Sequence, residues 1–169
     1  MGLAGCEALG LGGPREDKRL LVITETDGCF VDGLSAATGC TIGHRTLRVE
    51  DYGKAAAVFV DTIAGSALRL APVLDLRERA YVYATGESRR YFAQLNGYQV
   101  MPATEMFSFL PVSLKSSIDE IVSRPRVRTN CAHCGEEIIN ERQIYRDNQC
   151  YCRACALGAF YEVTSPTNS

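Results

Sequence analysis

The chain has 169 residues, of which 46% are hydrophobic and 22% charged, and its formal net charge is −2. This length and composition predict one main domain with a hydrophobic core and a small appended domain. The acidic balance argues against general nucleic-acid binding, and no stretch reaches the roughly 18 apolar residues that a transmembrane helix needs. The N-terminal segment lacks the basic region and cleavage site of a secretory signal, so we expect a cytoplasmic protein. Its eight cysteines are then free for metal binding or redox chemistry, or are simply buried.

The first quarter of the chain predicts two helices around one strand. Residues 2–11 predict a short helix that ends at the glycines before Pro14, and residues 20–24 predict a buried strand. Residues 27–38 predict a second helix that ends near Gly39.

Two cysteines flank this second helix. Cys29 lies in its first turn with Asp32 on the same face, and Cys40 follows the helix in a turn bracketed by glycines. The unpaired N–H groups and the dipole at a helix N-terminus favour a thiolate at Cys29. Cys29 and Cys40 are therefore candidates for a second transition-metal site or a redox-active pair. The alternative is that both are small buried hydrophobic residues.

Two strands and a polar cluster come next. Residues 55–62 and 67–72 predict strands joined by a turn at residues 64–66. Before them, Tyr52 and Lys54 stand beside an aspartate and a glycine. These side chains form either a polar site or a solvated turn, which is the ordinary place of such residues.

A basic, proline-containing link marks the predicted domain boundary. Residues 87–96 and 114–122 predict helices, and the link follows them. We therefore divide the chain into an α+β domain at residues 1–123, a zinc ribbon at residues 124–160 and a disordered tail at residues 161–169.

Two C-x-x-C pairs lie in the ribbon, Cys131 with Cys134 and Cys152 with Cys155. The spacing is typical of two metal-binding turns whose four thiolates hold one Zn²⁺ in a tetrahedral site. Such a closed site leaves no position for a substrate or a reactive water, which indicates a structural ion. Two disulfides are the alternative. Cys150 is either a free thiol packed beside the second pair, or an alternate ligand or redox partner.

The link into the ribbon carries a small basic cluster, Arg124, Arg126 and Arg128. Zinc ribbons often bind partners, but no aromatic side chains that could stack on bases interleave these arginines. We therefore expect a protein partner or a homo-oligomer, and neither a membrane nor nucleic acid. His133, inside the first cysteine pair, is expected to be a solvated loop residue.

Several of these segments together resemble the E subunit of formylmethanofuran dehydrogenase and its many stand-alone relatives. The resemblance covers about residues 2–156 and rests on Cys29-Phe30-Val31-Asp32, Thr38-Gly39-Cys40-Thr41-Ile42-Gly43, Leu47, Asp51-Tyr52-Gly53-Lys54, Met101-Pro102, Phe107 and the C-terminal ribbon. It implies an α+β domain in which helices pack on a mixed β-sheet, with the zinc ribbon appended. It also implies a second metal or redox site around Cys29, Asp32 and Cys40.

One feature of the family is missing from this chain. Family members begin with a His-Gly-His-x-Cys-Pro-Gly-like segment, whereas this chain begins at Met1, inside what resembles the helix that follows it. Either the start is truncated, or the second site has lost part of its ligands. Cys6 is a candidate substitute ligand, although the simpler interpretation is a small residue on an apolar helix face.

The leading hypothesis is a zinc-binding accessory or metal-handling protein of this family, with a redox role for Cys29 and Cys40 as its variant. The resemblance assigns the oxidoreductase chemistry of the complex to a molybdenum or tungsten cofactor on other subunits. A thiol- or metal-dependent enzyme is the second hypothesis, with Cys29 as nucleophile or metal ligand and Asp32 or Tyr52 as base. Lys54 would supply electrophilic support. A module that uses the ribbon to bind a partner protein is the third hypothesis.

Overall fold

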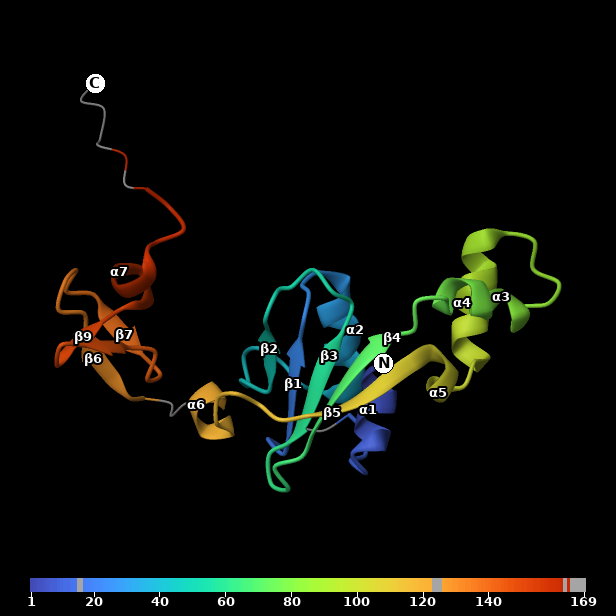
Figure 1. The fold of residues 1–169 in the computed structure, drawn as a ribbon, viewed down its shortest axis with the longest axis horizontal. Helices are drawn as coiled ribbons and strands as arrows, with labels where there is room; N and C mark the ends of the chain where they lie inside the picture. The colour runs from blue at the N-terminus through green and yellow to red at the C-terminus, as the bar shows by residue number, and fades with distance from the viewer. Residues whose placement is uncertain (15–16, 123–125, 163, 165–169) are drawn as a thin grey trace. The chain divides into compact units, whose positions relative to one another are not determined.

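Five strands form a mixed sheet in the first of two units into which the chain divides, Met1–Ile118 and Asp119–Ser169 (Figure 1). The computed structural model describes residues 1–14, 17–122, 126–162 and 164. The strands of this sheet are β1 (Leu20–Thr24), β2 (Leu47–Val49), β3 (Ala57–Asp61), β4 (Ala67–Pro72) and β5 (Phe107–Val112). Their order is β2-β1-β3-β4-β5, with β1 and β2 parallel and the other neighbours antiparallel.

Two helices, α1 (Gly2–Ala8) and α2 (Cys29–Thr38), pack against one face of this sheet. Successive residues of a strand point to opposite sides, so every second strand residue faces the helices. The buried strand residues of this layer include Leu20, Val22, Phe59 and Leu70. At Gly5, α1 comes so close to β3 that an added Cβ would lie 2.6 Å from the Phe59 ring. Close packing of α1 on the sheet therefore requires glycine at this position.

The predicted α+β class, with helices packed on a mixed sheet, is confirmed. β1 occupies the predicted residues, and α2 ends where predicted, because Gly39 takes a left-handed φ of 74°. The N–H of Gly39 donates to the carbonyl of Ser35 and closes the last turn of α2. The hairpin of β3 and β4 also follows the prediction, whereas β2 and β5 were not predicted.

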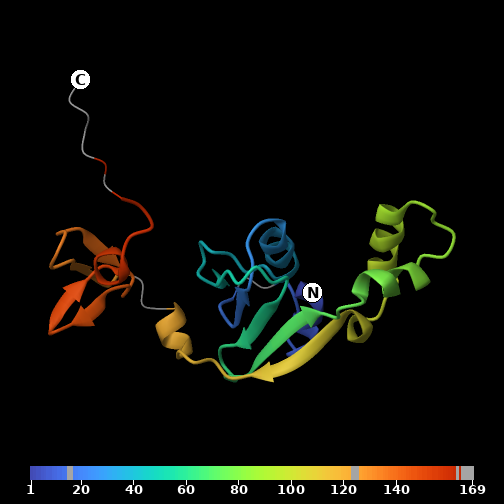
Figure 2. The ribbon, with the colours of Figure 1, turned by 45° about the horizontal axis from the view of Figure 1, so that its top comes forward.

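Between β4 and β5 the chain forms two helices, α3 (Leu76–Val82) and α4 (Arg90–Val100), and then a short helix, α5 (Ala103–Met106). We call residues 74–100 the helical arm. In both views α3 and α4 lie side by side beyond the end of β4, away from α1 and α2 (Figures 1 and 2). Each of these two helices packs mainly against the other. The helix predicted at residues 87–96 is α4 with shifted bounds, and α3 was missed.

A buried carboxylate stabilises the turn between β3 and β4. Asp61 is 2% exposed and accepts hydrogen bonds from Arg19 Nε at 3.0 Å and Arg19 Nη2 at 2.7 Å. The N–H groups of Ile63 and Ala64 donate to the same carboxylate. Arg19 is the main reason that the pKa of Asp61 lies well below its ordinary value of 3.8, and the two backbone donors add to the effect.

We expect Asp61→Asn to destabilise the protein by about 2 kcal/mol at neutral pH, because the amide loses charge-assisted bonds at a buried position. The lowered pKa means that the carboxylate stabilises the fold above pH 3.8, and that this stabilisation is lost as the pH falls further, since the unfolded chain takes up the proton first. Urea unfolding at about pH 7 and about pH 3 should show a smaller difference between wild type and variant at the lower pH. An equal difference at both pH values would contradict this role.

The second unit contains two hairpins and a short helix. These elements are β6 (Arg128–Asn130) paired with β7 (Glu137–Ile139), β8 (Ile144–Arg146) paired with β9 (Gln149–Tyr151), and α7 (Arg153–Leu157). The helix predicted at residues 114–122 is the shorter α6 (Ile118–Val122).

Some predicted features fall where the structure makes no statement. The predicted boundary between residues 123 and 124 lies outside the described residues, as do residues 163 and 165–169 of the predicted tail. Among the described residues, no helix is both long and apolar enough to cross a membrane.

Candidate metal centre

Four cysteines converge in the second unit, and two local structures position them. Cys131 and Cys134 lie in the turn between β6 and β7, where Gly135 takes a φ of 76°. Cys152 is the N-cap residue of α7, and Cys155 lies within that helix. The hairpin of β8 and β9 returns the chain, so that the second pair lies beside the first.

The four sulfur atoms form one compact group. The Sγ atoms of Cys131, Cys134, Cys152 and Cys155 all lie within 4.8 Å of one another, and those of Cys134 and Cys152 are 4.0 Å apart. Four thiolates at Zn–S distances of about 2.3 Å would stand about 3.8 Å apart, so this group could hold a metal ion. All eight cysteines are free thiols, so neither of the alternative disulfides is present.

Hydrogen bonds and mutual proximity shape the ionisation of the group. The N–H of Cys152 donates to Cys131 Sγ, and the N–H of Cys155 donates to Cys152 Sγ, both at 3.3 Å. The backbone N–H groups of Cys134 and Cys152 lower the pKa of Cys131 to about 6. The neighbouring Cys152 thiol, followed by desolvation, raises the pKa of Cys155 to about 12. One thiolate therefore forms readily, and a bound cation would be needed to keep all four thiols ionised.

Two further residues beside the group make contacts that residue spacing does not reveal. His133, expected to be solvated, places Nδ1 3.5 Å from Cys155 Sγ. Cys150 is not a member of the four-sulfur group. Its carbonyl instead accepts a hydrogen bond from the N–H of Ala132 at 2.7 Å, which joins the end of β9 to the first cysteine turn.

The donor set restricts the ions that fit. Soft thiolates in a tetrahedral group of four sulfur atoms suit Zn²⁺ or iron. Four protein ligands would fill every position of a tetrahedral ion, as in sites whose metal stabilises structure.

The structure does not bring the second predicted cysteine pair together. Cys29 is exposed at the first residue of α2, whereas Cys40 lies beyond its last residue and is 2% exposed. At about 1.5 Å per residue, this helix holds its two ends on the order of 15 Å apart. Cys40 Sγ lies 3.4 Å from the carbonyl oxygen of Leu20, to which it donates, and burial raises the pKa of the thiol. Cys40 is therefore packed as a small buried residue.

The other candidate catalytic residues lie on the surface. Asp32, Tyr52 and Lys54 are exposed. The N–H groups of Tyr52 and Lys54 both donate to the carbonyl of Glu25, at 2.9 and 3.1 Å, and so fold this segment against the end of β1. This arrangement matches the solvated turn that was the alternative to a polar site.

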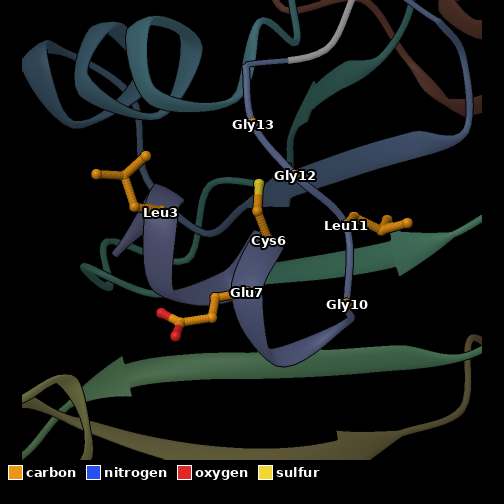
Figure 3. Close-up of a pocket in the computed structure, with 7 residues that line it drawn as sticks. All are labelled: Leu3, Cys6, Glu7, Gly10, Leu11, Gly12 and Gly13. Carbon is orange, nitrogen blue, oxygen red and sulfur yellow. The ribbon is translucent and has the colours of Figure 1, made fainter.

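Cys6, the candidate substitute ligand, is buried in α1 and lines a pocket (Figure 3). Its side chain points toward the Gly12–Gly13 segment, and a Cβ on Gly13 would lie 3.3 Å from its sulfur. Glu7 points to another side of the same pocket. Within the described part of the chain, the four cysteines of the second unit form the only group of three or more potential metal ligands.

We expect Cys29 to be the most readily alkylated thiol of the first unit, because Cys6 and Cys40 are each 2% exposed. Brief treatment of native protein with iodoacetamide, followed by peptide mass spectrometry, should show at least about tenfold more modification at Cys29 than at Cys40. Protein unfolded in guanidinium is the control, and its three thiols should react similarly. Equal labelling in the native protein would contradict the packing of Cys40.

Comparisons with known proteins can be set beside this geometry. The family profile described as "FmdE, Molybdenum formylmethanofuran dehydrogenase operon" matches residues 1–108. A solved structure from Syntrophus aciditrophicus, of an FmdE-like protein of the tungsten formylmethanofuran dehydrogenase type, matches with a TM-score of 0.51 and 19% sequence identity. The match covers 95% of this chain and 92% of that chain, and at this identity it shows a shared fold. No curated protein sequence matches the chain.

Proposed function

This chain belongs to the FmdE family, and on that basis we propose that it is an accessory protein of a formylmethanofuran dehydrogenase-type oxidoreductase, stabilised by a structural zinc ion. The proposed ligands are Cys131, Cys134, Cys152 and Cys155. The observation that carries the proposal is the convergence of their four sulfur atoms within 4.8 Å. A closed site of this kind contributes to folding and leaves chemistry to other groups.

Two further observations support an accessory role. The family description names a dehydrogenase operon, which favours a protein partner from the same operon. The reactive candidates of the first unit are dispersed, with Cys29 and Cys40 at opposite ends of α2. Free thiols that serve as ligands persist in a reducing compartment, so we place the protein in the cytoplasm.

A second candidate function is a protein-binding role for the ribbon that is independent of any dehydrogenase. Three aromatic side chains favour it, since Tyr145, Phe160 and Tyr161 are 67%, 100% and 56% exposed, and aromatic residues are enriched at interfaces. Arg128 of the basic link forms an ion pair with Glu137 at 2.6 Å, so part of the link's charge is compensated locally. This favours a protein over nucleic acid as the partner.

Metal release under a chelator tests whether the ion is structural or a cargo for delivery. The zinc-loaded full chain is mixed with excess chelator, and zinc release is followed with a chromogenic indicator while hydrogen exchange reports on Asp119–Ser169. For a structural ion, zinc release and loss of amide protection in this unit proceed at the same rate. Zinc that leaves while the unit stays protected would overturn the structural role and favour metal handling.

The partner claim has a separate test. A tagged chain expressed in its native host should co-purify with other subunits of the dehydrogenase. Loss of that association in a variant that cannot bind metal would show that the folded ribbon takes part. Recovery of the tagged chain without any dehydrogenase subunit would contradict the accessory role.

A further inference from the structure

The helical arm, residues 74–100, packs with its small residues inside. Its buried residues are Ala80, Ala84, Ala93 and Gly97. The two helices approach so closely that a Cβ on Gly97 would collide with the backbone carbonyl of Ala80. Small residues permit this approach, but their burial removes little apolar surface from water.

The large apolar side chains of the arm lie on its outside. Their exposed fractions are 105% for Leu74, 74% for Val82, 70% for Tyr91, 65% for Val100, 41% for Leu95 and 39% for Phe92. A surface helix ordinarily turns such residues toward the core, and the arm does the opposite. Single exposed apolar residues are normal, but a cluster of this size marks an interaction surface.

The arm gains little stability from the rest of its own chain. The Tyr83 hydroxyl donates to Glu105 Oε2 at 2.8 Å and so connects the end of α3 to α5. Beyond such contacts, α3 and α4 pack mainly on each other. They have seven and eleven residues, fewer than the about 12–15 that even a good isolated helix needs in water. Cover from another element would therefore stabilise the arm strongly.

The size of the exposed apolar surface fits a dimer interface. If each large side chain offers about 150 Å², the exposed fractions amount to about 600 Å² for one arm. Each partner in a standard protein interface contributes about 800 Å² in total, including its polar rim. An arm with its flanking polar residues reaches this range.

The charge of the arm suits a second copy of itself. The arm contains four arginines and three acidic residues. Arg79 pairs with Asp75 at 2.8 Å, and Arg89 pairs with Glu87 at 3.0 Å. Two nearly neutral arms with mixed charges do not repel each other, and such a surface has no feature that selects a strongly acidic or basic partner.

We propose that two copies of this chain associate through their helical arms. α3 and α4 of one copy pack with α3 and α4 of the other, so that four helices bury the apolar side chains that two leave exposed. A twofold axis brings the same surface of each copy into contact, which is the commonest symmetry of homodimers. This association goes beyond the proposed accessory role and does not depend on the metal centre.

Light scattering on the eluting full chain tests this proposal. Wild type should have twice the 18.5 kDa mass of one chain. The double variant Val82→Glu, Val100→Glu places charges at positions that are 74% and 65% exposed in the single chain, so it should fold but not pair. We expect its dimer Kd to rise at least about 100-fold. Ile63→Glu, at a 77% exposed position in the turn after β3, is the matched control and should remain dimeric.

Hydrogen exchange on the wild-type chain is a second test that does not depend on a variant. When the protein is diluted below the dimer Kd, amides of α3 and α4 should lose protection while those of β1 and β3 keep theirs. A monomeric wild type, a dimer that persists in the arm variant, or arm protection that dilution leaves unchanged would each overturn the proposal.

Discussion

Replacing Cys131 and Cys134 with serine is expected to remove the bound metal and unfold the second unit, while the first unit keeps its fold. In its described part, the second unit buries only three hydrophobic residues, Cys131, Ile138 and Ala156. A module this small cannot fold on such a core alone. Structural zinc supplies about 10 kcal/mol or more to small domains, which exceeds the stability that the rest of this unit can provide.

Hydrogen exchange resolves the two units in one experiment. In the double variant, amides from β6 to α7 should exchange at the rates of an unfolded chain, and those of β1 and β3 should stay protected. Cys150→Ser is the matched control, because it makes the same chemical change two positions from Cys152 and outside the four-sulfur group. This control should keep both the metal and the protection. A protected second unit in the metal-free double variant would contradict metal-dependent folding.

Gly5→Leu is expected to destabilise the first unit by about 3 kcal/mol, because the new side chain overlaps the core. A Cβ at this position already lies 2.6 Å from the ring of Phe59, which is 0% exposed. In a close-packed interior the ring has no free space into which it could move. Phe59→Ala alone should cost about 4 kcal/mol, since it leaves a cavity between α1 and β3.

Combining the two substitutions tests the contact directly. The leucine side chain of Gly5→Leu occupies part of the volume that Phe59→Ala vacates, so the double variant should be at least about 1 kcal/mol more stable than the sum of the single effects predicts. Gly33→Ala is the matched control, because no atom lies within 4 Å of the added Cβ in α2. It should be stabilising by about 0.5–1 kcal/mol. Strictly additive effects in urea unfolding would contradict the packing of α1 on Phe59.

Local signals in the sequence predicted the elements that local chemistry determines. β1 is a short run of apolar and β-branched residues, and α2 lies between Gly28 and Gly39, which both take positive φ. β2 has only three residues, too few for a periodic pattern. β5 contains Pro111, which lacks an N–H and so argues against a strand. An edge strand tolerates this proline, but only the strand pairing reveals that β5 lies at the edge.

The helical arm was predicted only in part because its helices lack the ordinary amphipathic pattern. In α3 the single buried residue is Ala80, and the larger apolar residue Val82 is exposed. An apolar face with a helical period was therefore absent from this stretch of sequence. The property that hid α3 at the level of sequence is the same one that points to a dimer.

The candidate site divides in the same way. Each C-x-x-C pair is a local feature, so its spacing predicted the cysteines that the structure brings together. The expected pairing of Cys29 and Cys40 depended on where the two ends of α2 lie, and a helix keeps its ends apart. The contact of His133 with Cys155 joins different turns of the ribbon, which residue spacing does not encode.

The metal content of the anaerobically purified full chain tests the central claim most directly. We predict one zinc ion per chain, and none when Cys131, Cys134, Cys152 and Cys155 are all replaced with serine. A chain that contains no metal, or a metal that survives this replacement and is lost only on substitution of Cys29 or Cys40, would contradict a structural zinc site in the second unit.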